Sequence, residues 1–320
     1  MVLIVQRCFM IDPRLRVLRV VSARGTISAA ADDLGYTPSA VSHQLRMLSR
    51  ELGVRLLEPE GRGVRLTPVA VLLLARGEEL LTHWESIRAE IQQASGAHLG
   101  RLRLAGFSTA ASMLLPTVAA AVMREFPATP VRIIEADPDV CFEMLLADRV
   151  DVAVVVTTDR LPSTDDPRFE QHPLMQDDLD LLVPAGHRLA GRRSVALAEA
   201  AEESWIMDRP GRPYHQLVSG ACAAAGFTPR QAHEVTEWDT GAALVAAGLG
   251  VALAPRLVRL PADELLVRVP VRGDAGPARY IRTSIRRGTA DQPEIALALT
   301  ELEQVAGRVG AAGLERRESL

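Results

Sequence analysis

The chain has 320 residues, which is too long for one small domain and predicts two or three. Hydrophobic residues make up 48% of it, enough for substantial cores, and the formal net charge of −4 excludes a protein that is basic over its whole surface. No apolar run approaches the roughly 20 residues of a membrane-spanning helix, so we expect no membrane partner.

The charge is distributed unevenly along the chain. Residues 11–67 contain nine Arg against six Asp and Glu, whereas residues 68–320 contain 26 Arg against 34 Asp and Glu. A modestly basic N-terminal part is compatible with local contact to phosphates. Neither the three distant cysteines nor the seven histidines have the spacing of a disulfide framework or metal site, so we expect no metal, no cofactor and a reducing cytoplasm.

The first recognisable helix begins at Asp12-Pro13, where a capping side chain precedes a first-turn proline. This predicts a first helix over 12–23. Residues 1–10 lack the basic start and the length of a signal peptide. We expect them to be a disordered extension, with the native start at Met10.

Residues 26–48 predict two helices with a short break. The first covers 27–34 and ends at a glycine, and Thr37 then caps a second helix whose first residue is Pro38. In the second helix the apolar residues at 41, 45 and 48 share one face, and Ser39, Ser42, His43 and Arg46 share the other. The polar face is suited to base edges and phosphates in a major groove. An ordinary helical hairpin with a solvated polar face is the alternative.

A short hairpin is predicted over 58–67, where two glycines flank Arg62 and a short alternating strand follows. Beside the two-helix unit it is interpreted as a wing whose tip reaches the DNA backbone or minor groove. A solvated Gly-Arg turn is the alternative. These elements form a predicted winged helix-turn-helix domain over 11–67.

A long helix is predicted over 68–95, opened by Thr67-Pro68. Its apolar residues recur at spacings close to a coiled-coil seam: Leu73, Leu80, Trp84, Ile87 and Ile91. We predict a dimerisation helix that pairs two DNA-reading units. Packing of this helix against the chain's own second domain is the alternative.

After a linker at 95–100 the predicted secondary structure changes from helices to alternating strands and helices. Strands are predicted at 101–106, 131–136, 151–156, 179–184, 204–208, 233–236, 250–255, 263–270 and 278–285, and helices at 108–126, 140–147, 215–225, 240–247 and 293–309. The fold class is therefore α/β behind an all-α winged head. We predict a two-lobed domain over 96–310, with lobe I at 100–158 and 268–310, lobe II at 159–267, and a tail at 311–320. Two crossovers would leave a cleft between the lobes.

With both halves in place, the chain resembles the LysR-type transcriptional regulators over nearly all of residues 11–310. The match is specific in the head, through ISAAADDLGYTPSAVSHQLRML, ELGVRLLE and GRGVRLT, and looser behind it, through LRLAGFST, ADRVDVAVV, VPAGHRLA and LVAAGLGVALAP. The resemblance implies promoter DNA as a partner, a dimer and tetramer, and an effector domain like periplasmic solute-binding proteins. It implies these DNA contacts: Thr37, Pro38, Ser39, Ser42, His43, Gln44, Arg46, Arg62 and Arg65. Pro59, Glu60 and Ser49 depart from the family's usual residues, and the first two are expected to weaken phosphate binding by the wing.

A small-molecule effector is expected in the cleft. Ser108 and Thr109 follow a strand end and open a helix, which favours an anion, although simple helix capping is the alternative. The second lobe would contribute the loop arginines Arg209 and Arg212. The other candidates are Ala136, Asp137, Trp238 and Thr240. We therefore predict a carboxylate or other anionic effector, while exposed loop arginines and a core Trp238 stay possible readings.

The chain lacks the sequence patterns of the common enzymes. It contains no GxSxG, Walker loop, GxGxxG or HExxH, so no catalytic residues are predicted. A cytoplasmic solute-binding sensor without specific DNA binding is the alternative function, since the two-lobed domain over 96–310, taken alone, would predict a solute-binding protein.

Overall fold

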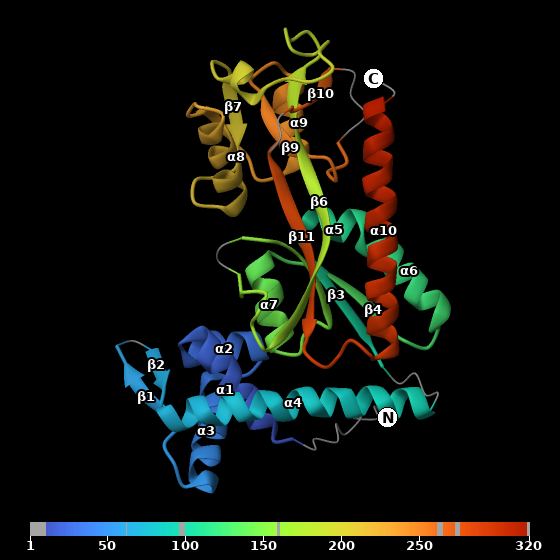
Figure 1. Cartoon of the computed structure of the whole chain (residues 1–320). Coiled ribbons are helices and arrows are strands. Elements are labelled where there is room, and N and C mark those ends of the chain that lie inside the picture. Colours follow the sequence, from blue (N-terminus) through green and yellow to red (C-terminus); the bar gives the residue numbers. More distant parts are fainter. Residues whose placement is uncertain are drawn as a thin grey trace.

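The computed structural model describes residues 11–61, 63–95, 100–158, 161–260, 265–272 and 276–318. The predicted extension at 1–10 and the wing residue Arg62 lie outside these residues. Figure 1 shows a helical head at the start of the chain, one long helix beside it, and two α/β lobes stacked above.

The head is built from helices α1 (Pro13–Arg24), α2 (Ile27–Leu34) and α3 (Pro38–Leu52). Their starts agree with the sequence because each cap is local: Thr26 accepts a hydrogen bond from the Ala29 amide and Thr37 from the Ala40 amide, both at 3.2 Å. Buried aliphatic side chains, with Leu18 and Val41 at 0% exposure, hold the three helices together.

The wing is an antiparallel pair of strands, β1 (Leu57–Glu60) and β2 (Gly63–Leu66). It is attached to the head by a hydrogen bond of 2.9 Å from the Val64 amide to the Gly25 carbonyl. A Cβ on Gly63 would lie 2.5 Å from that same carbonyl oxygen. Glycine at 63 is therefore required by the close approach of two backbones.

Helix α4 (Pro68–Ser95) runs uninterrupted for 28 residues, as predicted. One side contacts the chain itself: the Gln292 amide donates to Glu85 at 2.8 Å, and a Cβ on Gly288 would lie 2.5 Å from the Thr82 carbonyl oxygen. On another side Val69, Leu80 and Ile91 are exposed large apolar residues. Leu73 of the predicted seam packs instead against the core of the head. Packing of α4 against the chain's own second domain is therefore shown for one face, and the dimer seam stays a prediction.

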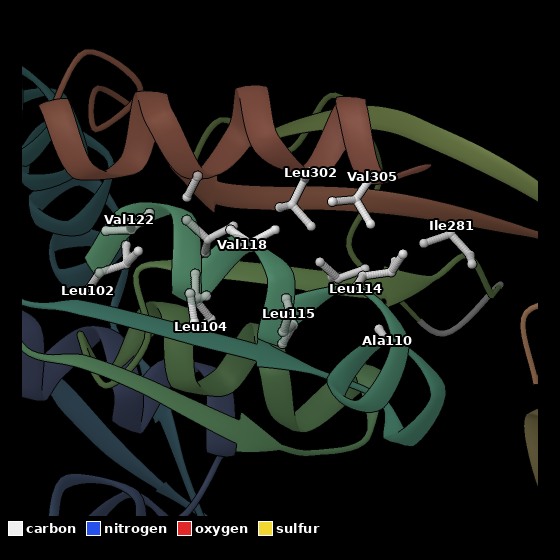
Figure 2. Close-up of a cluster of buried hydrophobic side chains, with 14 of the residues drawn as sticks. Leu102, Leu104, Ala110, Leu114, Leu115, Val118, Val122, Ile281, Leu302 and Val305 are labelled. Atoms are coloured by element: carbon white, nitrogen blue, oxygen red, sulfur yellow. The ribbon is translucent and has the colours of Figure 1, made fainter. Parts of the chain in front are cut away.

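Lobe I contains a sheet with the strand order β6, β11, β5, β3, β4. The strands are β3 (Leu102–Gly106), β4 (Val131–Glu135), β5 (Val152–Val156), β11 (Ala278–Arg286) and the first half of β6 (Phe169–Pro184). Helices α5 (Ser108–Met113), α6 (Leu115–Glu125) and α10 (Pro293–Glu318) cover one face, and α7 (Pro138–Leu146) covers the other. Figure 2 shows the aliphatic core between α6, α10 and the sheet.

Lobe II is built on the second half of β6. The strands β9 (Ala252–Pro255) and β10 (Leu266–Pro270) pair with it, and β7 (Ser204–Met207) and β8 (Arg230–Glu234) form a parallel pair nearby. A 3-10 turn at Leu197–Ala200 and the helices α8 (Pro213–Ala224) and α9 (Trp238–Ala246) complete the lobe. Its core surrounds the fully buried Trp205.

Several predicted boundaries differ from the structure; the helix predicted at 108–126, for example, is divided into α5 and α6. Strand β6 begins at Phe169 and has 16 residues, because it runs through both lobes and not only the second. Strand β10 belongs to lobe II, since Val269 and Val271 lie in that core, so lobe I resumes only after Val271 and not at 268 as predicted. Helix α10 continues to Glu318, which makes the predicted tail at 311–320 largely helical.

Candidate functional site

Helix α3 presents its polar face outward, away from the head core. Val41, Leu45 and Leu48 are at most 3% exposed and face inward. His43 and Arg46 are exposed, and Ser42 is half-buried at the edge of the same face. The remaining predicted contact residues on this helix, Thr37, Pro38 and Ser39, are exposed, and Gln44 is half-buried. The hydroxyls of Thr37 and Ser39 lie 3.0 Å apart, which orders the start of the helix.

A groove separates α3 from the wing. It is lined on one side by Ser42, Arg46 and Arg50, and on the other by Arg55 and Val64. Arg50 and Arg55 are exposed and were not among the predicted contacts. Arg50 could have been predicted from the sequence, because it follows Arg46 by four residues and so lies on the same face of the helix.

The positive charge of Arg65 on the wing is offset by a neighbouring carboxylate. The Arg65 guanidinium forms an ion pair of 2.6 Å with Glu58, its direct partner across the two strands. Glu60 and Pro59 also lie on β1. Because the pair is exposed, Arg65 retains access to a phosphate but must exchange a carboxylate for it.

A cavity of about 650 Å³ lies between the two lobes. Six predicted residues line it together: Ser108, Thr109, Ala136, Asp137, Arg212 and Trp238. Two do not. Arg209 and Thr240 are exposed and lie outside the lining. These two residues are therefore not part of the lining, and their contact with an effector stays a prediction.

Ser108 and Thr109 do not cap their helix. Phe107 is the N-cap of α5, and no side chain completes the cap. Thr109 is 4% exposed, and its hydroxyl has no hydrogen-bond partner among the residues that the structure describes. An unpaired buried hydroxyl is costly, so a bound polar group would satisfy it.

Arg212 connects the two lobes across the cavity mouth. Its Nε donates to Asp208 in lobe II at 3.0 Å, and its Nη2 lies 3.6 Å from Asp137 in lobe I. Trp238 meets Tyr214 edge to face, with ring centroids 4.9 Å apart. Burial raises the pKa of Tyr214, whose hydroxyl donates to the Leu253 carbonyl at 2.9 Å.

Sequence reasoning missed Arg279, a buried cation in the cavity wall. It is 5% exposed, lies 4.9 Å above the Phe107 ring, and forms an ion pair with Asp177 at 2.8 Å. Its position at the start of β11 has no local signal, since only the packing of the two lobes places this end of the strand in the cavity wall. Carboxylates also line the cavity, namely Glu135, Asp137, Asp208 and Glu237.

No group of three or more His, Cys, Asp or Glu could hold a metal ion within the described ranges. In the same part of the chain no helix is both long and apolar enough to cross a bilayer.

Comparison with known proteins identifies both halves of the chain. The family model described as bacterial regulatory helix-turn-helix protein, lysR family, matches residues 13–71, and the LysR substrate binding domain matches residues 95–307. The chain is 29% identical to the probable HTH-type transcriptional regulator LrrA of Synechococcus elongatus, over 94% of this chain and 99% of that one. It is 27% identical to the hydrogen peroxide-inducible genes activator of Dickeya chrysanthemi, over 71% of this chain and 73% of that one.

Solved structures share the fold over most of the chain. The LysR family regulator CbnR shares 25% identity and a TM-score of 0.53, over 90% of this chain and 98% of that chain. A full-length OxyR variant from Pseudomonas aeruginosa shares 22% identity and a TM-score of 0.61, over 92% and 93%. The second likeness concerns the fold alone. The winged head, the long helix, the two lobes and both family matches show that the chain belongs to the LysR family of bacterial transcriptional regulators.

Proposed function

We propose that the chain binds double-stranded promoter DNA with α3 in the major groove and the wing beside it. The outward polar face of α3 carries this proposal. Its opposite face is packed in the core of the head, so His43 and Arg46 are exposed and Ser42 lies half-buried beside them. Arg50 and Arg55 supply further cations along the groove beside it. A regulator of this kind works where the chromosome lies, in the bacterial cytoplasm.

Gel retardation with the DNA upstream of its own gene tests the proposal. We expect a complex that weakens steeply with salt and resists an excess of unrelated DNA, because phosphate contacts and base contacts both contribute. Retardation that unrelated DNA abolishes would favour the alternative, a solute-binding sensor without specific DNA recognition.

We propose further that a small molecule with a carboxylate group binds between the lobes and modulates DNA binding. Three donors in the cavity support the anionic group: the unpaired Thr109 hydroxyl, Arg212 and Arg279. The carboxylates of the same lining favour a hydrogen-bond donor or positive charge elsewhere on the molecule. The Asp137–Arg212 pair would then open to admit the effector, whose carboxylate replaces that of Asp137.

Replacing Arg212 or Ser108 by alanine should weaken effector binding. A carboxylate identified by thermal-shift screening is titrated calorimetrically into each variant. Loss of the Arg212 guanidinium is expected to weaken binding about ten-fold or more, since charged hydrogen bonds contribute about 1.5–3 kcal/mol. Arg209→Ala is the matched control, because that arginine lies close in the chain but outside the cavity lining. Equal affinities of Arg212→Ala and Arg209→Ala would refute the anionic site.

A peroxide-sensing function, which the name of one relative raises, is not favoured. Cys141 and Cys222 are both 0% exposed, and burial raises the pKa of each thiol to about 12. Thiolate is the form that reacts with peroxide. Cys8 lies outside the described residues.

We propose that α4 pairs with a second copy of the chain, and that such dimers assemble into the tetramer implied by the family resemblance. Leu80 and Ile91, two residues of the predicted seam, are 58% and 56% exposed. Leu80→Glu should weaken the dimer about ten-fold or more in sedimentation, because a carboxylate would be buried in an apolar seam. Ala75→Glu, an exposed position of α4 outside the seam, is the control. Equal dimer affinities would exclude this face.

A further inference from the structure

We infer that helix α7 transmits the state of the interlobe cavity to the DNA-binding head of the same protomer. The inference rests on the proposed function and adds a route for its regulation. It rests on one geometric fact: the first turn of α7 lines the cavity, and its last turn contacts the head.

The N-terminal end of α7 responds to lobe closure. Asp137 is the N-cap of the helix, and Pro138 is its first residue. Both line the cavity, and Asp137 lies 3.6 Å from Arg212 of the opposite lobe. Any opening of the lobes, or any ligand that takes Arg212, changes the electrostatic pull on this end of the helix.

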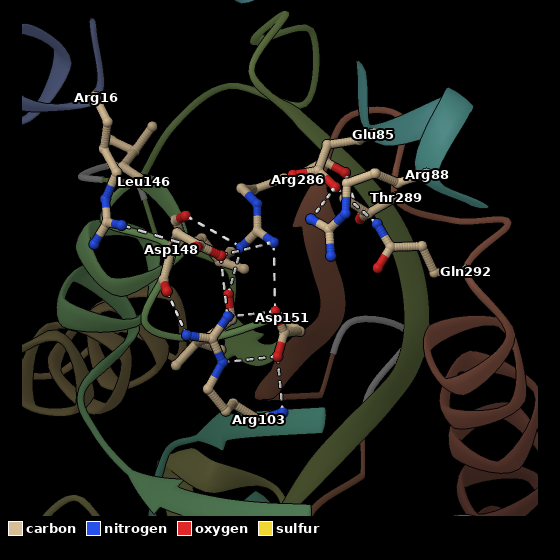
Figure 3. Close-up of polar contacts among 12 residues, drawn as sticks. Arg16, Glu85, Arg88, Arg103, Leu146, Asp148, Asp151, Arg286, Thr289 and Gln292 are labelled. Carbon is tan, nitrogen blue, oxygen red and sulfur yellow. Dashed lines mark hydrogen bonds and ion pairs between the residues drawn. The ribbon is translucent and has the colours of Figure 1, made fainter. Parts of the chain in front are cut away.

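The C-terminal end of α7 contacts three arginines of α1. Arg19 donates to the Leu146 carbonyl, Arg24 pairs with Glu143, and Arg16 lies 3.8 Å from Asp148. Cations at a helix C-terminus meet unsatisfied carbonyls and the negative end of the helix dipole. Ala147, directly after the helix, packs within the core of the head. Figure 3 shows Leu146 and Asp148 on the side of the network that Arg16 approaches.

This contact is more than a surface ion pair. Arg19 is 7% exposed and also pairs with Glu78 of α4 at 3.3 Å, so head, long helix and lobe I meet at one guanidinium. Burial lowers the pKa of Arg19 and attraction to Glu78 opposes that shift. Separation of the head from lobe I would leave buried polar groups without partners, and this cost in free energy stabilises the contact between them.

Helix α7 is short and firmly packed between its two ends. Its nine residues span about 13 Å at 1.5 Å per residue. Cys141, Phe142 and Leu145 are buried against lobe I, and the Phe142 ring meets Phe169 edge to face at 4.9 Å. A packed helix of this length moves as one body, so a displacement at the cavity reaches the head contact.

A double-mutant cycle on DNA affinity tests the route without any effector. Arg212→Glu places a carboxylate against Asp137 and Asp208 at the cavity end, and Glu143→Arg places a cation against Arg24 at the head end. The probe is the DNA upstream of the gene, titrated into the full chain. Glu125→Arg makes the same charge change at an exposed residue of lobe I on α6.

We expect Arg212→Glu to change the DNA dissociation constant about five-fold or more in the otherwise unaltered chain and in Glu125→Arg, a typical size for coupling between sites. In Glu143→Arg the same substitution should change it less than about two-fold. If Arg212→Glu fails to fold, Asp137→Ala removes the same ion pair. Equal effects in the Glu143→Arg and Glu125→Arg chains, or no effect in any chain, would overturn the route. Failure of the unaltered chain to bind this DNA selectively would instead contradict the proposed function.

Discussion

Ser42→Leu should abolish sequence-selective DNA binding, and Arg46→Ala should weaken it about ten- to a hundred-fold, the cost of losing a base or phosphate contact of about 1–3 kcal/mol. Both residues border the groove between α3 and the wing. Ser42 lies at the edge of the exposed face, where a leucine side chain would meet the duplex and keep α3 from seating in the major groove. Footprinting and salt-dependent titration of the upstream DNA measure both effects.

The control for this prediction is Arg14→Ala. Arg14 lies in the head, but its ion pairs are with Asp12 and Glu51 of the head itself. We expect near-normal DNA affinity for this variant and unchanged thermal unfolding for all three. A normal footprint from Ser42→Leu would show that another face of the head reads the DNA.

The second large effect is expected from Asp151→Asn, which should lower the free energy of unfolding by about 3–5 kcal/mol. Asp151 is 6% exposed and accepts hydrogen bonds from the Arg103 amide at 2.9 Å and from its guanidinium at 2.6 and 2.8 Å. Arg286 contacts the same carboxylate at 3.4 Å (Figure 3). An amide at this position supplies one acceptor oxygen and no charge, so the two largely buried guanidinium groups lose one of their two carboxylate partners and keep only Asp148.

Urea unfolding followed by the fluorescence and circular dichroism of the chain measures the loss, and Asp165→Asn provides the matched substitution at an exposed residue. That control should stay within about 0.5 kcal/mol of the unaltered chain. Similar unfolding midpoints for the two variants would show that the network around Asp151 adds little to stability.

The neighbouring Asp148 belongs to the same network, and its carboxylate stays ionised although it is largely buried. Burial acts to raise the pKa of Asp148, but attraction to Arg286, Arg103 and Arg16 is stronger and holds the pKa well below its usual range. Since the pKa is depressed in the folded state, the stabilising contribution is complete above the unfolded pKa of about 4 and is lost as the pH falls below it. Asp148 also joins lobe I to Arg16 of the head, so acid should loosen both together.

The head was predictable from sequence because its signals are local. Thr26, Thr37 and Pro38 set where helices begin, and the spacing of Val41, Leu45 and Leu48 sets which face is buried. Once the inward face is known, the outward position of Ser42, His43 and Arg46 follows from helical geometry. Arg50 could have been added by the same reasoning, whereas Arg55 lies beyond the helix and depended on where the wing packs.

The cavity was predictable only in part, because its walls come from segments that are distant in the chain. Strand ends at Ser108 and Asp137 are local features, and both line the cavity as expected. Arg209 and Arg212 look equivalent in sequence, but Arg212 stands at the N-cap position of α8 with its guanidinium near Asp137, whereas Arg209 is exposed. Arg279 had no signal, since a charge within a strand ordinarily indicates exposure.

The sequence by itself determined the family, the winged head and the α/β texture of the lobes, because capping, periodicity and short motifs act within a few residues. Only the tertiary structure decided that β6 passes through both lobes, that Arg279 is buried over Phe107, and that α7 touches cavity and head at once. Those features depend on which distant surfaces bury each other, and that choice is made by the packing of the whole chain.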